Sequence, residues 1–169
     1  MPSTGSSGAA ARVRAHLVIA NQTLESEALT RAIQDRAATG PCEFRLVVPA
    51  TPVNDLAGRS VPLTPMPVMG GVLSVPGDPD EARALAARKL ERALERLRAT
   101  GVPVDGAVGD ADPMRAAAEA IRQRRFDEVI VSTLPQRRSR WLRQDLPRRL
   151  ERALGLPVTH VEAAEPPAA

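Results

Sequence analysis

Short apolar runs alternate with longer amphipathic stretches along most of the chain. The apolar runs predict strands at residues 16–20, 44–48, 102–108, 127–133 and 157–161. Between them, apolar residues spaced by three and four predict helices at about 25–38, 80–99, 113–123 and 142–154. Strand cores that are apolar throughout and separated by amphipathic helices indicate a parallel sheet covered on both faces. The pattern therefore predicts a single α/β domain.

Prolines and glycines break this pattern in one long stretch. Residues 51–79 contain six prolines and four glycines and have no sustained periodicity. We expect a loop of this length to be either functional or disordered. Residues 1–11 and the tail at 164–169 are low in complexity and are expected to be disordered, which leaves 12–163 as the folded domain.

Composition limits the setting in which this domain works. The chain has 169 residues, enough for one domain with a full core, and only 2% of them are aromatic, so the core must be aliphatic. The lone cysteine, Cys42, excludes an internal disulfide and fits a reducing cytoplasm. No apolar run approaches the roughly 20 residues of a membrane span, and the first residues do not resemble a secretory signal. We therefore expect a cytoplasmic protein that does not cross a membrane.

Positive charge is unevenly distributed, although the net charge is only +3. Seven arginines fall within sixteen residues near the C-terminus: Arg137, Arg138, Arg140, Arg143, Arg148, Arg149 and Arg152. Such a cluster can bind phosphate or nucleic acid, but it can also be the solvated face of a helix in an arginine-rich protein. Nearly all basic residues of this chain are arginine, and Lys89 is the only lysine. Because the chain uses arginine in place of lysine throughout, the number of arginines is weak evidence for either function.

The order of elements, with Gly109 and Pro113 after the third strand, resembles the universal stress protein family over about residues 13–163. The segments at 20–26, 126–131 and 156–161 are similar to the family's first loop, fourth strand and closing strand. The resemblance implies an α/β fold with a single open five-stranded parallel sheet, order 3-2-1-4-5, and helices on both faces. It also implies dimerisation through the last strand, as in many members.

One motif of the family is missing. ATP-binding members carry Gly-x2-Gly-x9-Gly-Ser/Thr after the fourth strand, where glycines let backbone N–H groups approach the phosphates. In neither possible register does this chain keep a glycine, and Pro135 and Asp145 fall at or beside the motif positions. Proline has no N–H to offer, and a carboxylate repels a polyphosphate. We therefore do not expect ATP to bind in the family's usual mode.

Arginines could replace the missing backbone cradle, because guanidinium groups bind phosphate and carboxylate bidentately. Ligands of open α/β sheets bind at the carboxyl ends of the strands. The candidate ligand-binding residues are therefore those that follow the first and fourth strands: Asn21, Ser132, Thr133, Arg137, Arg138 and Arg140. Capping and surface solubility are the alternative explanation for these arginines.

Other polar residues have simpler explanations. His16 and His160 lack partners at metal-ligand spacing, so we predict no metal site. Asp110 and Asp112 could contact a ribose or Mg²⁺, but a turn and a cap for the helix at Pro113 explain them more simply. Trp141 could stack on a base or anchor a helix. No catalytic triad or dyad is recognisable, so we predict that the protein is not an enzyme.

Three functional hypotheses remain open. The first is a non-catalytic binding or regulatory module for an anionic small molecule or nucleotide. The second is a protein-interaction scaffold with a degenerate nucleotide pocket. The third, an arginine-mediated nucleic-acid-associated factor, is disfavoured by the modest net charge.

The closing strand suggests how the chain assembles. In the order 3-2-1-4-5 it lies at an edge, and unpaired strand edges are usually covered, charged or paired. We expect a homodimer through the segment that lacks protective lysine or arginine: Val158, Thr159, His160 and Val161. The alternative is a short edge strand that the tail or the proline-rich loop shields.

Overall fold

The computed structural model describes residues 11–51, 79–135 and 145–164, and these form nine helices and strands. The strands are β1 (Arg14–Ile19), β2 (Cys42–Pro49), β3 (Val104–Gly109), β4 (Glu128–Thr133) and β5 (Val158–Glu162). The helices are α1 (Glu27–Thr39), α3 (Pro79–Ala99), α4 (Pro113–Gln123) and α6 (Leu146–Leu154). Most of the 51–79 loop lies outside the described residues, so the expectation for it stays a prediction. Within the described ranges, none of the helices combines the length and apolar character needed to cross a bilayer.

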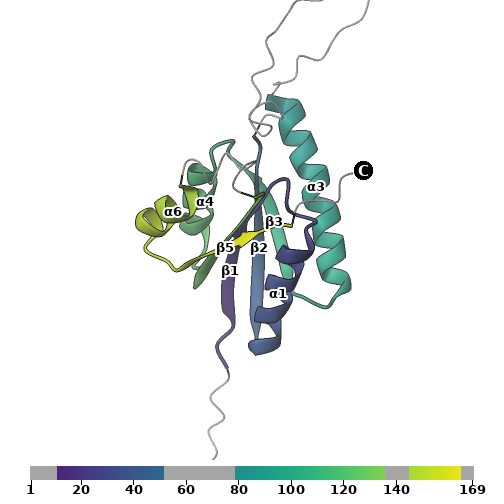
Figure 1. Cartoon of the computed structure of the whole chain (residues 1–169), viewed down its shortest axis with the longest axis vertical. Coiled ribbons are helices and arrows are strands. Elements are labelled where there is room, and N and C mark those ends of the chain that lie inside the picture. Colours follow the sequence, from purple (N-terminus) through teal and green to yellow (C-terminus); the bar gives the residue numbers. More distant parts are fainter. Residues whose placement is uncertain (1–10, 52–78, 136–144, 165–169) are drawn as a thin grey trace, which may run out of the picture.

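The five strands form one sheet in the order β3-β2-β1-β4-β5, and every pairing is parallel. This confirms the predicted fold class. Helices cover both faces: α1 and α3 pack on one side and α4 and α6 on the other (Figure 1). Successive side chains of a strand point to opposite faces of the sheet, so strands that are apolar throughout need helices on both faces to bury them.

Each face of the sheet has its own apolar core. On the α1/α3 side, Val18, Phe44 and Ile130 pack against the helices, and all three are fully buried. On the α4/α6 side, Leu17 and Val131 pack against the inner surfaces of those helices. The sheet is therefore apolar on both faces, as the uninterrupted apolar runs predicted.

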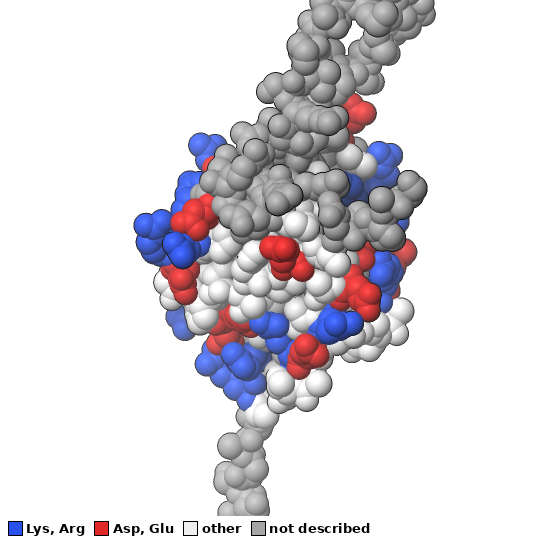
Figure 2. Space-filling model, in the orientation of Figure 1, with Lys and Arg blue, Asp and Glu red and all other residues white. Residues whose placement is uncertain are grey.

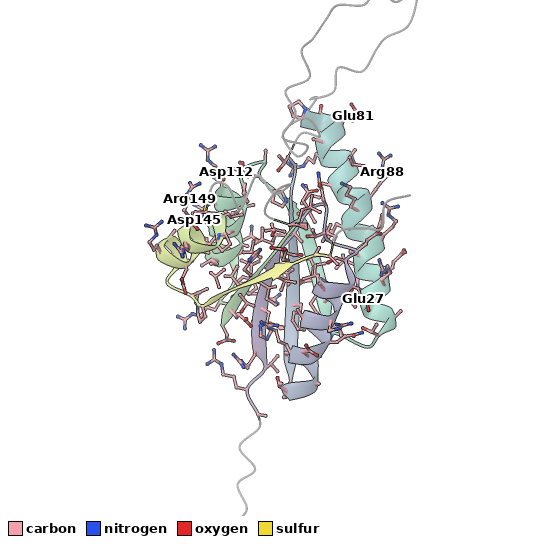
Figure 3. The ribbon with its side chains drawn as sticks, in the orientation of Figure 1. Glu27, Glu81, Arg88, Asp112, Asp145 and Arg149 are labelled. Atoms are coloured by element: carbon pink, nitrogen blue, oxygen red, sulfur yellow. The ribbon has the colours of Figure 1, made fainter. Side chains whose placement is uncertain are left out.

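Capping side chains mark where two of the four described helices begin. Ser26 caps α1 by accepting a hydrogen bond from Leu29 N at 3.2 Å, so this helix starts two residues later than predicted. Asp112 caps α4 by accepting from Met114 N at 2.9 Å, with Pro113 at the first helical position (Figure 3). Asp110 accepts from Asp112 N at 2.8 Å, which confirms the turn predicted before α4.

Helix α6 begins at Leu146, not at residue 142 as the periodicity predicted. Asp145 occupies the cap position, but its φ of 54° is left-handed and its side chain makes no capping hydrogen bond. The carboxylate instead lies 4.0 Å from Arg148 Nε. The residue before Pro147 can start the helix because proline is tolerated in the first turn.

Candidate functional site

In the strand order, β1 lies next to β4. The helices that follow these two strands in the described residues, α1 after β1 and α6 after β4, cover opposite faces of the sheet. At such a switch point, the carboxyl ends of the strands frame a crevice. The register pairs Ile19 with Val131, so the residues that follow β1 and those that end β4 meet at the same end of the sheet. Asn21, Ser132 and Thr133 all lie at this end.

Asn21 is buried and its amide ties two strand ends together. Its Nδ2 donates a hydrogen bond to the carbonyl of Pro49 at 2.9 Å, which links the end of β1 to the end of β2. The amide oxygen Oδ1 accepts no hydrogen bond from the described residues. Asn21 can therefore offer an acceptor to a ligand while its donor holds the turn in place.

Ser132 and Thr133 are buried at the end of β4, and they face opposite sides of the sheet. Thr133 has the same parity as Val131, on the α4/α6 side, and its Oγ1 lies 2.7 Å from His160 Nε2 on β5. Ser132 has the same parity as Ile130, on the α1/α3 side. The structure therefore separates two hydroxyls that the sequence analysis had placed in one site, and Thr133 already has a partner.

Two hydroxyls at this end of the sheet lack a partner. Ser132 Oγ and Thr23 Oγ1 are inaccessible to solvent and form no hydrogen bond within the described part of the chain. Ser132 is 1% exposed and Thr23 3% exposed. Because a buried polar atom without a partner costs free energy, such atoms often mark where a ligand or an ordered water completes the structure. Thr23 was missed in the sequence because a threonine in a turn is usually a local cap.

The predicted arginines cannot be placed relative to this end. Arg137, Arg138 and Arg140 lie outside the described residues, and so does Trp141. Their role in binding stays a prediction.

A second polar cluster, near the beginning of β4, is also buried. The Glu128 carboxylate accepts hydrogen bonds from His16 Nδ1 at 2.9 Å, from Arg36 Nε at 2.7 Å and Nη2, and from Thr159 Oγ1. His16 stacks on Phe44, with ring centroids 4.9 Å apart. We call Glu128 and its three partners, His16, Arg36 and Thr159, the Glu128 cluster. The sequence gives little sign of it, because the four residues come from distant segments.

Burial and hydrogen bonding set the pKa values of Glu128 and His16. Burial alone would raise the pKa of Glu128, but hydrogen bonds from Arg36 and Thr159 and the charge of Arg36 outweigh it and lower that pKa to about 2. Burial lowers the pKa of His16 from 6.5, against the opposing effect of Glu128. The carboxylate is thus ionised, and His16 is neutral with Nδ1 as the donor. The partners of the Glu128 carboxylate all come from within the protein, so the cluster links β1, α1, β4 and β5.

The described residues contain no group of three or more His, Cys, Asp or Glu side chains placed to hold a metal ion. Cys42 is buried, and burial raises the pKa of its thiol, which lowers its reactivity.

Comparison with known proteins identifies the fold. No family model matches the sequence, and no curated protein is significantly similar to it. Among solved structures, a universal stress protein family protein from Burkholderia pseudomallei superposes with a TM-score of 0.57 at 17% identity, covering 89% of this chain and 97% of that one. A universal stress protein family protein from Arabidopsis thaliana with AMP bound gives 0.51 at 12% identity, covering 90% and 93%.

The chain has the universal stress protein fold. The match extends over nearly the full length of both relatives, so the shared architecture is the whole domain and not one motif. The resemblance inferred from the strand and helix order is therefore confirmed at the level of the fold.

Proposed function

We propose that this universal-stress-protein-like chain is a non-catalytic binding or regulatory module whose ligand is an anionic small molecule or nucleotide. The ligand would bind at the carboxyl ends of β1 and β4. The observation that carries the proposal is the pair of buried, unpartnered hydroxyls, Thr23 Oγ1 and Ser132 Oγ. The AMP bound by the Arabidopsis protein of the same fold supports a nucleotide as one candidate.

The chemistry of this end favours a ligand with a neutral polar part and an anionic part. The side chains there that could accept or donate further hydrogen bonds are uncharged: Asn21, Thr23 and Ser132. Hydroxyls and amides suit the hydroxyl groups and ring nitrogens of a nucleoside. An attached phosphate needs positive charge, and the sequence offers Arg137, Arg138 and Arg140 on the connection after β4. This mode differs from a glycine-rich cradle, in which backbone N–H groups contact the phosphates.

Titration calorimetry with AMP and ATP tests the proposal. We expect AMP to bind, and ATP to bind more weakly than a dissociation constant of about 10 μM, because more negative charge comes close to Asp145 without any glycine cradle. Replacing Thr23 by Val or Ser132 by Ala should weaken AMP binding by about tenfold, since each removes one hydrogen bond from a buried site.

Arginine variants test whether AMP binds at a specific site or through the overall positive charge of this region. The triple variant Arg137→Gln, Arg138→Gln and Arg140→Gln should abolish AMP binding. The matched control replaces Arg148, Arg149 and Arg152, which are exposed on α6, and it removes the same charge without touching the proposed site. Equal losses in both triple variants would show that only net charge matters and would contradict the proposal.

The protein-interaction scaffold stays the alternative. If neither AMP, ATP nor inorganic phosphate produces heat, and no nucleotide co-purifies with the protein, the scaffold is favoured. Binding to DNA or RNA that falls steeply with salt would instead favour the nucleic-acid-associated factor.

A further inference from the structure

A cleft lies beside the edge strand β3, and neither β1 nor β4 contributes a lining residue. It is bounded by β2, the edge strand β3 and helix α4, and Arg83 reaches it from α3. Its volume is about 190 Å³. Sites for drug-sized ligands measure roughly 300–1,000 Å³. This cleft is therefore too small for a nucleotide, and its volume suits a smaller molecule.

Small side chains form the floor of the cleft. Val47 on β2, Ala107 on β3, and Ala116 and Ala120 on α4 line it, together with Gly109. A Cβ at Gly109 would lie 2.7 Å from Ala116 Cβ and 3.0 Å from Val47 Cγ1, so glycine lets α4 lie close to the sheet there. The aliphatic side chains among these residues are small, which suits a short aliphatic group.

The walls carry charge of both signs. Arg45 and Arg83 line the cleft with Asp110 and Glu119, so the formal charges cancel. Arg45 is held by Asp105, with Nη1 3.3 Å from Oδ2. Arg83 and Glu119 are exposed and form no ion pair with any described residue.

We propose that this cleft binds a small zwitterion, an α-amino acid with a short aliphatic side chain. The arginines would take its carboxylate, the carboxylates its ammonium group, and the alanine floor its side chain. A simple anion would meet only the arginines favourably and a simple cation only the carboxylates, whereas a zwitterion can meet charges of both signs. The inference is independent of the nucleotide proposal, because it uses other strands and other residues.

L-valine is the probe, and two analogues each lack one of its charges. Isovalerate has the carboxylate without the ammonium group, and isobutylamine has the ammonium group without the carboxylate. We expect L-valine to shift the amide resonances of residues 107–110 and 119–123 in a heteronuclear titration of the full chain, with millimolar affinity. Each analogue should bind at least about tenfold more weakly, since it loses one charge-assisted contact.

Three variants test the residues. Arg83→Gln and Glu119→Gln should each weaken L-valine binding by about tenfold, and both leave the fold intact because the side chains are exposed. Ala107→Leu should abolish binding by filling the floor. The control is Arg88→Gln, an exposed arginine of α3 that points away from the sheet (Figure 3) and should bind L-valine like the parent.

The outcomes separate cleanly. Preferential binding of L-valine, lost in the three variants and kept in the control, supports the zwitterion site. Absence of shifts with L-valine, isovalerate binding as tightly as L-valine, or unchanged affinity in both charge variants would each overturn it. Shifts confined to the ends of β1 and β4 would also overturn it, while leaving the nucleotide proposal in place.

Discussion

The Glu128 carboxylate joins three strands and a helix at the level of single residues. It accepts from His16 on β1, Arg36 on α1 and Thr159 on β5, and its own strand, β4, lies between β1 and β5. The side chain of Glu128 is 12% exposed and that of Arg36 is 22% exposed, so solvent screens the pair only weakly. We therefore expect the charge on Glu128 to matter for stability.

The pH dependence follows from the sign of the shift. The pKa of Glu128 is 4.5 when unperturbed and about 2 in the folded chain. A lowered pKa means that the unfolded state binds the proton more readily, so the stabilisation is complete above pH 4.5 and is lost as the pH falls towards 2. The shift corresponds to about 3 kcal/mol. Urea unfolding at several pH values should show this fall.

Glu128→Gln should lower the free energy of unfolding at neutral pH by about 3 kcal/mol and flatten the acid dependence in this window. Glu27→Gln is the control. Glu27 forms an exposed ion pair with Arg31 one helical turn away, and its loss should cost less than about 0.5 kcal/mol. An acid dependence in Glu128→Gln as steep as in the parent would show that other groups control the transition.

At the scale of elements, the contact between α4 and the sheet depends on Gly109. The 2.7 Å and 3.0 Å approaches to Ala116 and Val47 leave no room for a methyl group. Gly109→Ala should therefore lower the free energy of unfolding by about 1–3 kcal/mol through overpacking.

A double-mutant cycle isolates this clash. Ala116→Gly removes the nearest methyl group and by itself costs about 1 kcal/mol in a helix. If the clash is the cause, Gly109→Ala should cost less in the Ala116→Gly background than in the parent. Costs that simply add would show that the contact with Ala116 does not set the penalty.

At the scale of the whole molecule, the position of β5 at an edge of the sheet favours a homodimer. Figure 2 shows the molecule from the side on which β5 lies in Figure 1. The middle of this face carries few charged side chains, and most charged side chains lie around its rim. Two hydrogen bonds join β4 to the ends of β5: Val129 N donates to Pro157 O, and Ala163 N donates to Thr133 O. Because alternate residues of a strand direct their backbone N–H and C=O groups to the same neighbour, those of Thr159 also point towards β4. The outward backbone groups therefore belong to Val158, His160 and Glu162, ready to pair about a two-fold axis.

Light scattering at micromolar concentration should give the mass of a dimer. His160→Pro should yield a monomer, because proline removes one outward N–H. His160→Ala is the matched control: it loses the same imidazole but keeps the N–H, and should stay dimeric. A monomeric parent, or a His160→Pro variant that stays dimeric, would contradict assembly through this edge.

The sequence by itself determined the elements and their class. Apolar runs and helical spacing depend on neighbouring residues, so the strands, the α4 cap at Asp112 and Pro113, and the parallel sheet could be predicted. The strand order came from resemblance to a known family, because periodicity does not say which strands are neighbours. The start of α6 was predicted too early, since apolar spacing continues upstream of the left-handed residue Asp145.

Only the tertiary structure decided which polar groups meet. Glu128 and Arg36 are 92 residues apart in sequence, and the strand register and the packing of α1 bring them together. The pairing of β4 with β5 gave Thr133 a partner in His160, 27 residues away in sequence. The cleft beside β3 exists because α4 packs on small side chains at that edge. The physical reason is that hydrogen bonds within a helix or turn are local, whereas a site is assembled by contacts between distant segments whose faces and register the local pattern does not specify.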